Sequence, residues 1–347
     1  LPTQEWITDR LADPATAWIE NDGGLAATFA VDERGGCEVD LARDGPHALV
    51  AGTTGSGKSE LLVSWLLALA SRYPPSALTI VAIDYKGGAT FGPLAPLPHV
   101  ADVLTDLDGA ATERALHGLK AELARRERAL ADAGARDLAD YRSRAGDGAP
   151  MGRLLVVVDE FRVLADEHPD LLAGLGRLAA QGRSLGIHLV LATQRPAGAL
   201  GSDLRANLAI SICLRVLNPA DSVDVISAPD GARLPPIPGR ALLRGVGDTA
   251  GAPRPVHAAW AGPPDAGREV VDSLRTAAAA MGEAPASSLW APPLPERFGK
   301  VRRRLEDGRC RLVGHLACLA TGRRRRLGHQ RRCAGRCAAG PGHRDRR

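Results

Sequence analysis

The run Gly-Thr-Thr-Gly-Ser-Gly-Lys-Ser at residues 52–59 constrains the fold more than any other feature of the chain. It has the spacing of a phosphate-binding P-loop, in which glycines let the backbone turn and point successive N–H groups at phosphate oxygens. The apolar stretch at residues 47–51 precedes it, and an amphipathic helix is predicted from about Lys58 to Arg72. A strand, a glycine-rich loop and a helix in that order predict an α/β domain that binds a nucleotide.

The P-loop spacing predicts the roles of Lys58 and Ser59. Lys58 is expected to reach the β- and γ-phosphates, and the Ser59 hydroxyl is expected to ligate Mg²⁺. The predicted cofactors are therefore ATP and Mg²⁺. The predicted nucleotide-binding residues are Gly52, Thr53, Thr54, Gly55, Ser56, Gly57, Lys58 and Ser59.

A second apolar strand, predicted at residues 154–158, ends in Asp159 and Glu160. Ligands of open α/β sheets bind at the carboxyl ends of strands. We predict that Asp159 holds Mg²⁺ through its water shell and that Glu160 polarises the attacking water. An apolar strand ending in Asp-Glu is a weak signal alone, but it becomes a strong one about a hundred residues after a P-loop.

A third predicted strand, at residues 188–193, ends in Thr193 and is followed by Gln194. A polar pair at this position lies beside the γ-phosphate and suits a sensor of hydrolysis; the alternative is an ordinary exit from strand to loop. Gln194 is the predicted sensor. The run at residues 84–88, Asp-Tyr-Lys-Gly-Gly, follows another strand on the same sheet edge, where it contacts nucleotide or a neighbour or forms a simple turn.

Two arginines are candidates for the cation that stabilises charge developing during hydrolysis, a group that a neighbouring subunit often supplies. Arg114 lies near the start of a helix predicted at residues 106–133. Arg183 lies near the end of a helix predicted at residues 169–185. The alternative for each is a solvated surface arginine.

The pattern of the whole chain indicates a mostly parallel sheet between helices, because strands that are apolar throughout alternate with helices. Further strands are predicted at residues 78–84, 210–216 and 241–243, and a small β-hairpin at residues 25–31 and 37–41. We divide the chain into an N-terminal β extension at 1–45, an ATPase domain at 46–262, a Pro- and Ala-rich linker with one helix at 263–300, and a tail at 301–347.

The tail differs from the rest in charge and in cysteine content. Residues 301–347 contain fifteen arginines and three acidic residues, a net charge of +12, whereas 29 Lys and Arg against 37 Asp and Glu leave residues 1–300 at −8. We interpret this Arg/Cys-rich tail as out-of-frame translation of a GC-rich gene, and hence as disordered. The alternatives are a basic arm that binds nucleic acid and a zinc site. The zinc ligands would be Cys318, His329, Cys333 and Cys337.

Five blocks occur in order along the chain: Gly-Thr-Thr-Gly-Ser-Gly-Lys-Ser, Asp-Tyr-Lys-Gly-Gly, Val-Val-Asp-Glu-Phe, Gly-Arg-Ser-Leu-Gly-Ile-His-Leu and Leu-Ala-Thr-Gln-Arg-Pro. Together they resemble the FtsK/SpoIIIE family of P-loop motors over roughly residues 20–260. The resemblance implies a RecA-like fold, ring hexamers or tandem motor domains, and ATP-driven movement of a polymer. It matches Asp159, Glu160 and Gln194 residue for residue to the roles given above, and Arg114 resembles the position that the secretion branch uses.

Two branches of this family remain open, chromosome translocases that move DNA and type VII secretion ATPases of the EccC/EssC kind that move secreted protein. The run from Asp84 to Ala89, with Asp44-Gly-Pro-His47 before the P-loop strand, is closer to the tandem-motor proteins. No membrane segment or winged helix is visible in the sequence, so we expect a cytoplasmic location, with membrane contact only through regions absent from this chain. The expected partners are copies of itself or neighbouring motor domains. A regulatory module that binds ATP without turnover is the alternative, and Glu160 argues against it.

Overall fold

The computed structural model describes the chain in segments: residues 5–21, 23–84, 90–105, 109–145, 151–196, 198, 201–247, 251–290, 303–306 and 309–312. The chain divides into two compact units, Leu1–Pro292 and Pro293–Arg347. In the second unit the described residues form a hairpin of β11 (Arg303–Glu306) and β12 (Arg309–Leu312). The zinc ligands considered for the tail lie outside the described residues.

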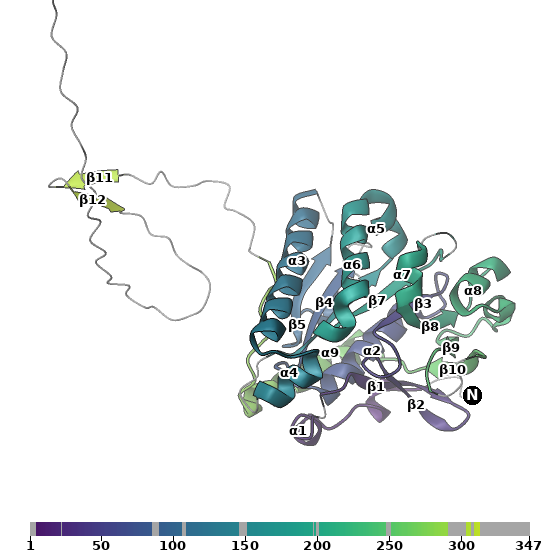
Figure 1. Cartoon of the computed structure of the whole chain (residues 1–347). Coiled ribbons are helices and arrows are strands. Elements are labelled where there is room, and N and C mark those ends of the chain that lie inside the picture. Colours follow the sequence, from purple (N-terminus) through teal and green to yellow (C-terminus); the bar gives the residue numbers. More distant parts are fainter. Residues whose placement is uncertain are drawn as a thin grey trace, which may run out of the picture. The chain divides into compact units, whose positions relative to one another are not determined.

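Within the described residues, the first unit is built on a ten-stranded sheet in the order β2-β1-β10-β9-β8-β3-β7-β6-β4-β5 (Figure 1). The strands are β1 (Ala26–Asp32), β2 (Gly35–Asp40), β3 (His47–Ala51), β4 (Leu78–Asp84), β5 (Val100–Thr105), β6 (Arg153–Asp159), β7 (Ile187–Thr193), β8 (Leu208–Leu214), β9 (Arg240–Arg244) and β10 (Arg254–Ala258). From β8 to β5 the ladders are parallel, and from β8 to β2 they are antiparallel.

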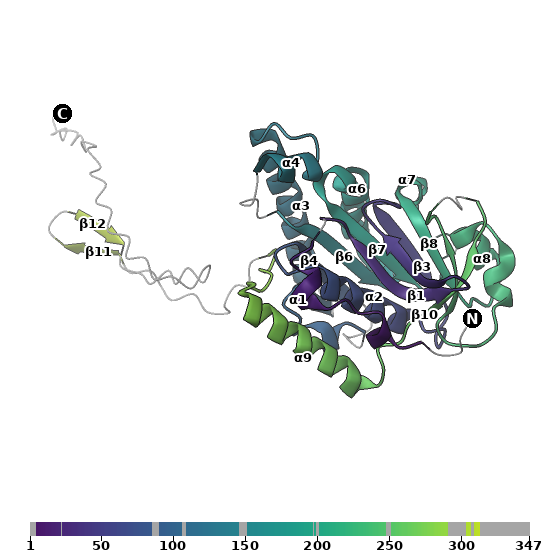
Figure 2. The ribbon, with the colours of Figure 1, turned by 90° about the horizontal axis from the view of Figure 1, so that it is seen from below.

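Helices cover both faces of this sheet, which confirms the predicted α/β class. They are α1 (Pro14–Ala17), α2 (Lys58–Arg72), α3 (Gly109–Asp132), α4 (Leu138–Ala145), α5 (Phe161–Glu167), α6 (Pro169–Leu185), α7 (Ser202–Asn207), α8 (Pro219–Ile226) and α9 (Pro264–Met281). One apolar core packs α2, α9 and Trp18, which follows α1, against one face of the sheet. A second core packs the helices from α3 through α8 against the other face (Figure 2). Parallel strands buried on both faces need such continuous apolar sequence.

The register of the parallel strands decides which residues meet at their carboxyl ends. β3 lies between β7 and β8, and Ala51 at its end pairs with Thr193. β6 lies between β4 and β7, and Asp159 at its end pairs with Asp84. Because these five neighbouring strands run the same way, their carboxyl ends form one edge of the sheet, and the P-loop follows β3 at this edge.

Several predicted elements are confirmed. The N-terminal hairpin is formed by β1 and β2, and β1 continues the main sheet by pairing with β10. α2 and α6 have the predicted bounds. The strand predicted at 210–216 is shifted to β8, and β5, β10, α4, α7 and α8 were not predicted.

The segment predicted to be a linker with one helix contains α9, and this helix packs against the core. α9 buries Val270, Val271, Leu274 and Ala278 in the core that also contains α2. The spacing of these residues is that of one helical face, and burial of apolar side chains stabilises the contact. After α9, the N–H of Ala286 donates to the carbonyl of Pro98 at 2.7 Å, so the chain continues along the β5 edge.

No helix among the described residues is long and apolar enough to cross a membrane.

Candidate nucleotide-binding and hydrolysis site

The P-loop is held open toward solvent by its glycines and by bonds to neighbouring strands. Gly55 and Gly57 have φ of +77° and +92°, in the left-handed region that favours glycine. A Cβ added to Gly57 would lie 2.5 Å from the backbone nitrogen of Gly239. The N–H of Gly239 donates to the carbonyl of Ser56 at 2.9 Å, so this loop and the P-loop are joined. Larger residues would fill the cradle or break this contact.

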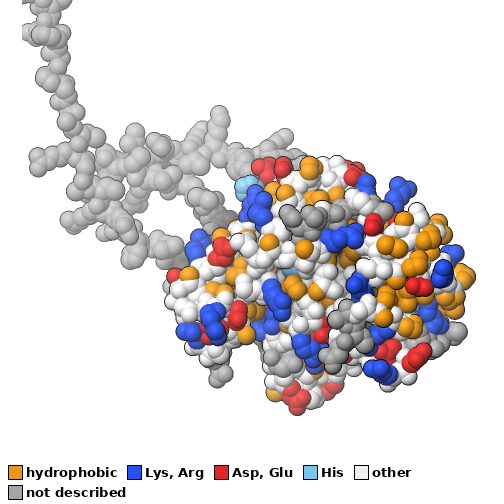
Figure 3. Space-filling view, turned by 45° about the vertical axis from the view of Figure 1, so that its right-hand side comes forward, with side chains coloured by type: hydrophobic (Ala, Val, Ile, Leu, Met, Phe, Trp, Pro, Cys, Tyr) orange, Lys and Arg blue, Asp and Glu red, His pale blue; other side chains and the backbone are white. Residues whose placement is uncertain are grey.

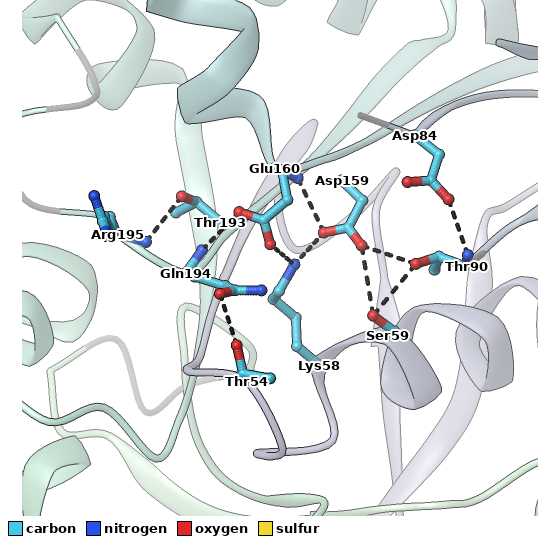
Figure 4. Close-up of polar contacts among 10 residues, drawn as sticks. All are labelled: Thr54, Lys58, Ser59, Asp84, Thr90, Asp159, Glu160, Thr193, Gln194 and Arg195. Atoms are coloured by element: carbon cyan, nitrogen blue, oxygen red, sulfur yellow. Dashed lines mark hydrogen bonds and ion pairs between the residues drawn. The ribbon is translucent and has the colours of Figure 1, made fainter. Parts of the chain in front are cut away.

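Lys58 begins α2 and turns its side chain toward the end of β6 (Figure 4). It is 4% exposed, and its Nζ contacts Asp159 Oδ1 and lies 2.9 Å from Glu160 Oε1. A buried ammonium needs a partner of opposite charge, and here two carboxylates provide it. The lysine that the sequence assigns to the phosphates is thus paired with the two acids assigned to magnesium and to water.

Glu160 is fixed by contacts on both sides. Its backbone lies in the left-handed region, with φ of 57°, which is uncommon for a residue with a side chain. Its N–H donates to Asp159 Oδ1 at 3.0 Å, and its Oε2 accepts from the N–H of Gln194 at 3.3 Å. The carboxylate therefore lies between the ends of β6 and β7.

Gln194 links the end of β7 to the P-loop. Its Oε1 accepts a hydrogen bond from the Thr54 hydroxyl at 2.9 Å, while its backbone N–H binds Glu160. Gln194 therefore connects the P-loop residue Thr54 to the Glu160 carboxylate. This geometry is what the predicted sensor requires, and the sensor role stays a prediction.

Thr90 also lies in this cluster, although it was not predicted. Its hydroxyl lies 3.1 Å from Asp159 Oδ2 and 3.3 Å from Ser59 Oγ, and its N–H donates to Asp84 Oδ2 at 2.9 Å (Figure 4). The sequence signal that could have indicated Thr90 was its position shortly after β4, a strand that ends in Asp84. Tyr85 to Gly88, the rest of the run that follows Asp84, lies outside the described residues.

The two candidate arginines are not drawn into this cluster. Among the described residues, no hydrogen bond or ion pair joins the side chain of Arg114 or Arg183 to Lys58, Asp159 or Glu160. Arg114 is half-buried near the start of α3, which follows the carboxyl end of β5. Arg183 is exposed at the end of α6, which leads into the first residue of β7 and so lies at the opposite edge of the sheet. Their action on a neighbour stays a prediction.

Two hollows adjoin the P-loop and share Gly57 and Glu60. The first, of about 210 Å³, is lined by the loop itself and by Gln194. The second, of about 350 Å³, has Leu61 and Pro238 among its apolar walls and Trp260 at its rim. Burial raises the pKa of Glu60 between them, an effect that its hydrogen bond to Trp260 opposes.

Comparison with known proteins agrees with this geometry. The model of the FtsK/SpoIIIE family matches residues 10–198, which is more than half of the chain. The chain belongs to this family. Its ten-stranded sheet and P-loop site are therefore those of an FtsK/SpoIIIE-type ATPase module.

Similar proteins within this family act in type VII secretion. The chain is 40% identical over 203 residues to the type VII secretion system protein EssC of Staphylococcus aureus strain Mu50, a match that covers 58% of this chain and 14% of EssC. The chain therefore spans about a seventh of the length of such relatives.

Two solved structures of one secretion ATPase are similar to this chain. The cytoplasmic domain of the Thermomonospora curvata type VII secretion ATPase EccC has a TM-score of 0.75 at 33% identity, covering 84% of this chain and 36% of that chain. ATPases 2 and 3 of the same EccC, in complex with a signal sequence peptide, have a TM-score of 0.68 at 27% identity, covering 79% and 50%.

Proposed function

We propose that this chain binds ATP with Mg²⁺, hydrolyses the ATP, and acts as one motor module in the transport of a secreted protein. The observation that carries the proposal is the buried cluster of Lys58, Asp159 and Glu160 beside the P-loop. Family membership supports the nucleotide, and the cluster supports turnover because it contains both a phosphate-binding cation and a base for water.

Lys58 is the group that responds to nucleotide. Its ammonium is paired with Asp159 and Glu160. A bound triphosphate offers it stronger negative charge at the P-loop, so Lys58 turns to the β- and γ-phosphates and releases both carboxylates. When Lys58 exchanges its carboxylate partners for phosphates, the same movement binds the nucleotide and frees Glu160 to act as a base.

The released carboxylates then have separate tasks. Asp159 and the Ser59 hydroxyl, which lie 3.5 Å apart, would hold Mg²⁺, and the ion would supply positive charge to neutralise the β- and γ-phosphates. Glu160, held by the N–H of Gln194, accepts the proton of the attacking water. The water oxygen bonds to the γ-phosphorus as the bond to the β–γ bridging oxygen breaks, which gives ADP and phosphate.

The two hollows supply room for the rest of the nucleotide. The hollow of about 210 Å³ at residues 53–55 suits the phosphates, and the adjoining hollow of about 350 Å³, with apolar walls, suits the sugar and base. Gly57 and Glu60 line both, so a single extended ligand can occupy them together.

A secreted protein is the favoured polymer. The similar EccC structure holds a signal sequence peptide, and the relatives named above are type VII secretion proteins. The net charge of −8 on residues 1–300 disfavours a DNA backbone. Neighbouring motor domains, in tandem or as copies, would supply the arginine that acts on this site, and the module would work in the cytoplasm.

Two substitutions test hydrolysis. Glu160→Gln should keep ATP affinity and lower phosphate release by a factor of about 100 or more, because the base is lost while the fold and phosphate contacts remain. Lys58→Ala should lose nucleotide affinity. Nucleotide binding is measured by fluorescence of a labelled ATP, and turnover by phosphate release.

The matched control is Glu167→Gln, the same chemical change at an exposed position at the end of α5. It should behave as the parent does. Turnover at the parent rate in Glu160→Gln would contradict the role of Glu160. Tight ATP binding without turnover in the parent chain would instead favour the regulatory module.

A further inference from the structure

Three oxygen atoms from distant parts of the sequence meet beside the P-loop (Figure 4). The Thr90 hydroxyl lies 3.1 Å from Asp159 Oδ2 and 3.3 Å from the Ser59 hydroxyl, and the Ser59 hydroxyl lies 3.5 Å from Asp159 Oδ2. Ser59 and Asp159 are the two residues assigned above to Mg²⁺. Thr90 therefore contacts both of them and completes a triangle of oxygen atoms.

The ligand preference of Mg²⁺ suits this triangle of oxygen atoms. The ion takes oxygen ligands, keeps several of its waters and is bound by few protein carboxylates. Among the described residues, no group of three or more His, Cys, Asp or Glu side chains is placed to hold a metal. The hydroxyls of Ser59 and Thr90 lie next to the Asp159 carboxylate and add two oxygen atoms to it. A threonine hydroxyl has one donor and two acceptor sites, so it can bind a metal-bound water as well as Asp159.

Asp84 holds Thr90 in this position. It is 1% exposed, and its Oδ2 accepts from the Thr90 N–H at 2.9 Å. It ends β4 in register with Asp159 at the end of β6, so two acidic residues from adjacent strands flank Thr90. Two carboxylates placed this close also make the local potential favourable to a cation.

We propose that Thr90 is the third protein residue of the magnesium site, binding the water shell of the ion through its hydroxyl, and that Asp84 is the positioning residue for Thr90. The proposal rests on the proposed function, because the ion enters with the nucleotide. It separates the hydroxyl of Thr90, which acts on the metal, from the P-loop backbone, which acts on the phosphates.

The test measures metal binding rather than turnover. The full chain is loaded with ADP, and binding of Mn²⁺ as a magnesium substitute is followed by electron paramagnetic resonance. Thr90→Val, which removes the hydroxyl and keeps the shape, should weaken Mn²⁺ binding about 10-fold, the usual effect of losing a group that supports a metal site. ADP affinity in EDTA should stay at the parent value. Thr90→Ser should restore Mn²⁺ binding, and Asp84→Asn should weaken it.

The matched control is Thr79→Val, the same change near the start of β4, at the opposite end of that strand from Asp84. It should bind Mn²⁺ as the parent does. Parent-like Mn²⁺ binding by Thr90→Val would overturn the proposal, and so would equal losses in Thr90→Val and Thr90→Ser, because the hydroxyl would then be irrelevant. A parent chain that binds no nucleotide, with or without metal, would overturn the proposed function as well.

Discussion

Glu160 combines a functional side chain with a backbone conformation that side chains disfavour. Its φ of 57° places it in the left-handed region, which costs a residue with a Cβ of order 1 kcal/mol or more. The conformation turns the chain between β6 and α5 and directs the carboxylate toward Lys58 (Figure 4). Glycine would relieve the cost and remove the proposed base, so stability and the proposed hydrolysis conflict at this position.

A pair of variants isolates this cost. Glu160→Gly should be more stable than Glu160→Ala by about 1 kcal/mol, because both lack the carboxylate and only alanine keeps the Cβ. The measurement is urea unfolding of both variants without nucleotide. At Glu167, in the last turn of α5, the same pair should give the opposite order, since glycine is the poorer helix former. If the alanine variant were the more stable one at both sites, the Glu160 backbone would be unstrained.

At the scale of single residues, the sequence was most informative where a motif fixes a position relative to a strand end. Asp159 ends an apolar strand, Gln194 directly follows one, and Lys58 and Ser59 follow one after the loop at residues 52–57. The structure brings all four together. Thr90 was missed because it meets Asp159 across 69 positions of sequence, and no local pattern predicts such a contact.

At the scale of elements, buried histidines join the strands at the end of the sheet opposite the P-loop. His47, the first residue of β3, donates from Nε2 to the Ala179 carbonyl at 2.9 Å and accepts the Leu189 N–H on Nδ1 at 3.0 Å. Both ring nitrogens are thus used in the neutral form, and protonation would set an N–H against an N–H. Burial lowers the pKa of His47 to about 4, and the pKa of His99, before β5, also to about 4.

His188, in β7, adds to the same effect. Burial lowers its pKa well below the usual value, and Arg153 lowers it further, with a guanidinium nitrogen 3.2 Å from Nε2. Because all three pKa values are lower in the folded than in the unfolded chain, the unfolded chain binds more protons below pH 6.5. Stability is therefore complete above about pH 6.5 and is lost as the pH falls toward 4.

The expected loss is large. At pH 5 His47 and His99 should each destabilise the fold by about 2 kcal/mol relative to pH 7.5, and the lowered pKa of His188 adds a loss of the same sign. Urea unfolding at the two pH values measures it. His99→Gln should make the loss smaller by about 2 kcal/mol. His117→Gln, at a 72% exposed position on α3, is the control and should leave it unchanged. An equal pH effect in parent and His99→Gln would contradict this account.

Strands and helices with long apolar runs were predicted well. Elements that lack such a run and depend on contacts with neighbouring elements were not. β5 is half-buried along its length and contains Asp102, so it lacks the apolar run of a central strand. β10 contains Pro255, which has no N–H for the ladder and argues against a strand. One helix was predicted in the Pro- and Ala-rich residues 263–300, and α9 is that helix, but its packing in the core that contains α2 was not predicted.

At the scale of the whole molecule, the distribution of charge along the chain bears on whether the polymer is DNA or a secreted protein. Residues 1–300 carry a net charge of −8, and on the face drawn in Figure 3 basic and acidic side chains are intermixed. A protein that follows a DNA backbone needs clustered cations, which release counterions and make binding fall steeply with salt. The positive charge of this chain is instead concentrated in residues 301–347, at +12.

ATP hydrolysis by residues 1–300 should therefore be insensitive to double-stranded DNA, whereas the full chain should bind DNA through its tail and release it as salt rises. The measurement is phosphate release with and without DNA at about 50 and 200 mM salt, beside DNA binding by both chains. A signal-sequence peptide is the matched addition, and an increase in rate with the peptide alone would support a secreted protein as the polymer. If DNA increased the rate of ATP hydrolysis by residues 1–300 and the increase fell as salt rose, DNA would replace a secreted protein as the proposed polymer. Residues 1–300 would then bind a phosphate backbone despite their net negative charge.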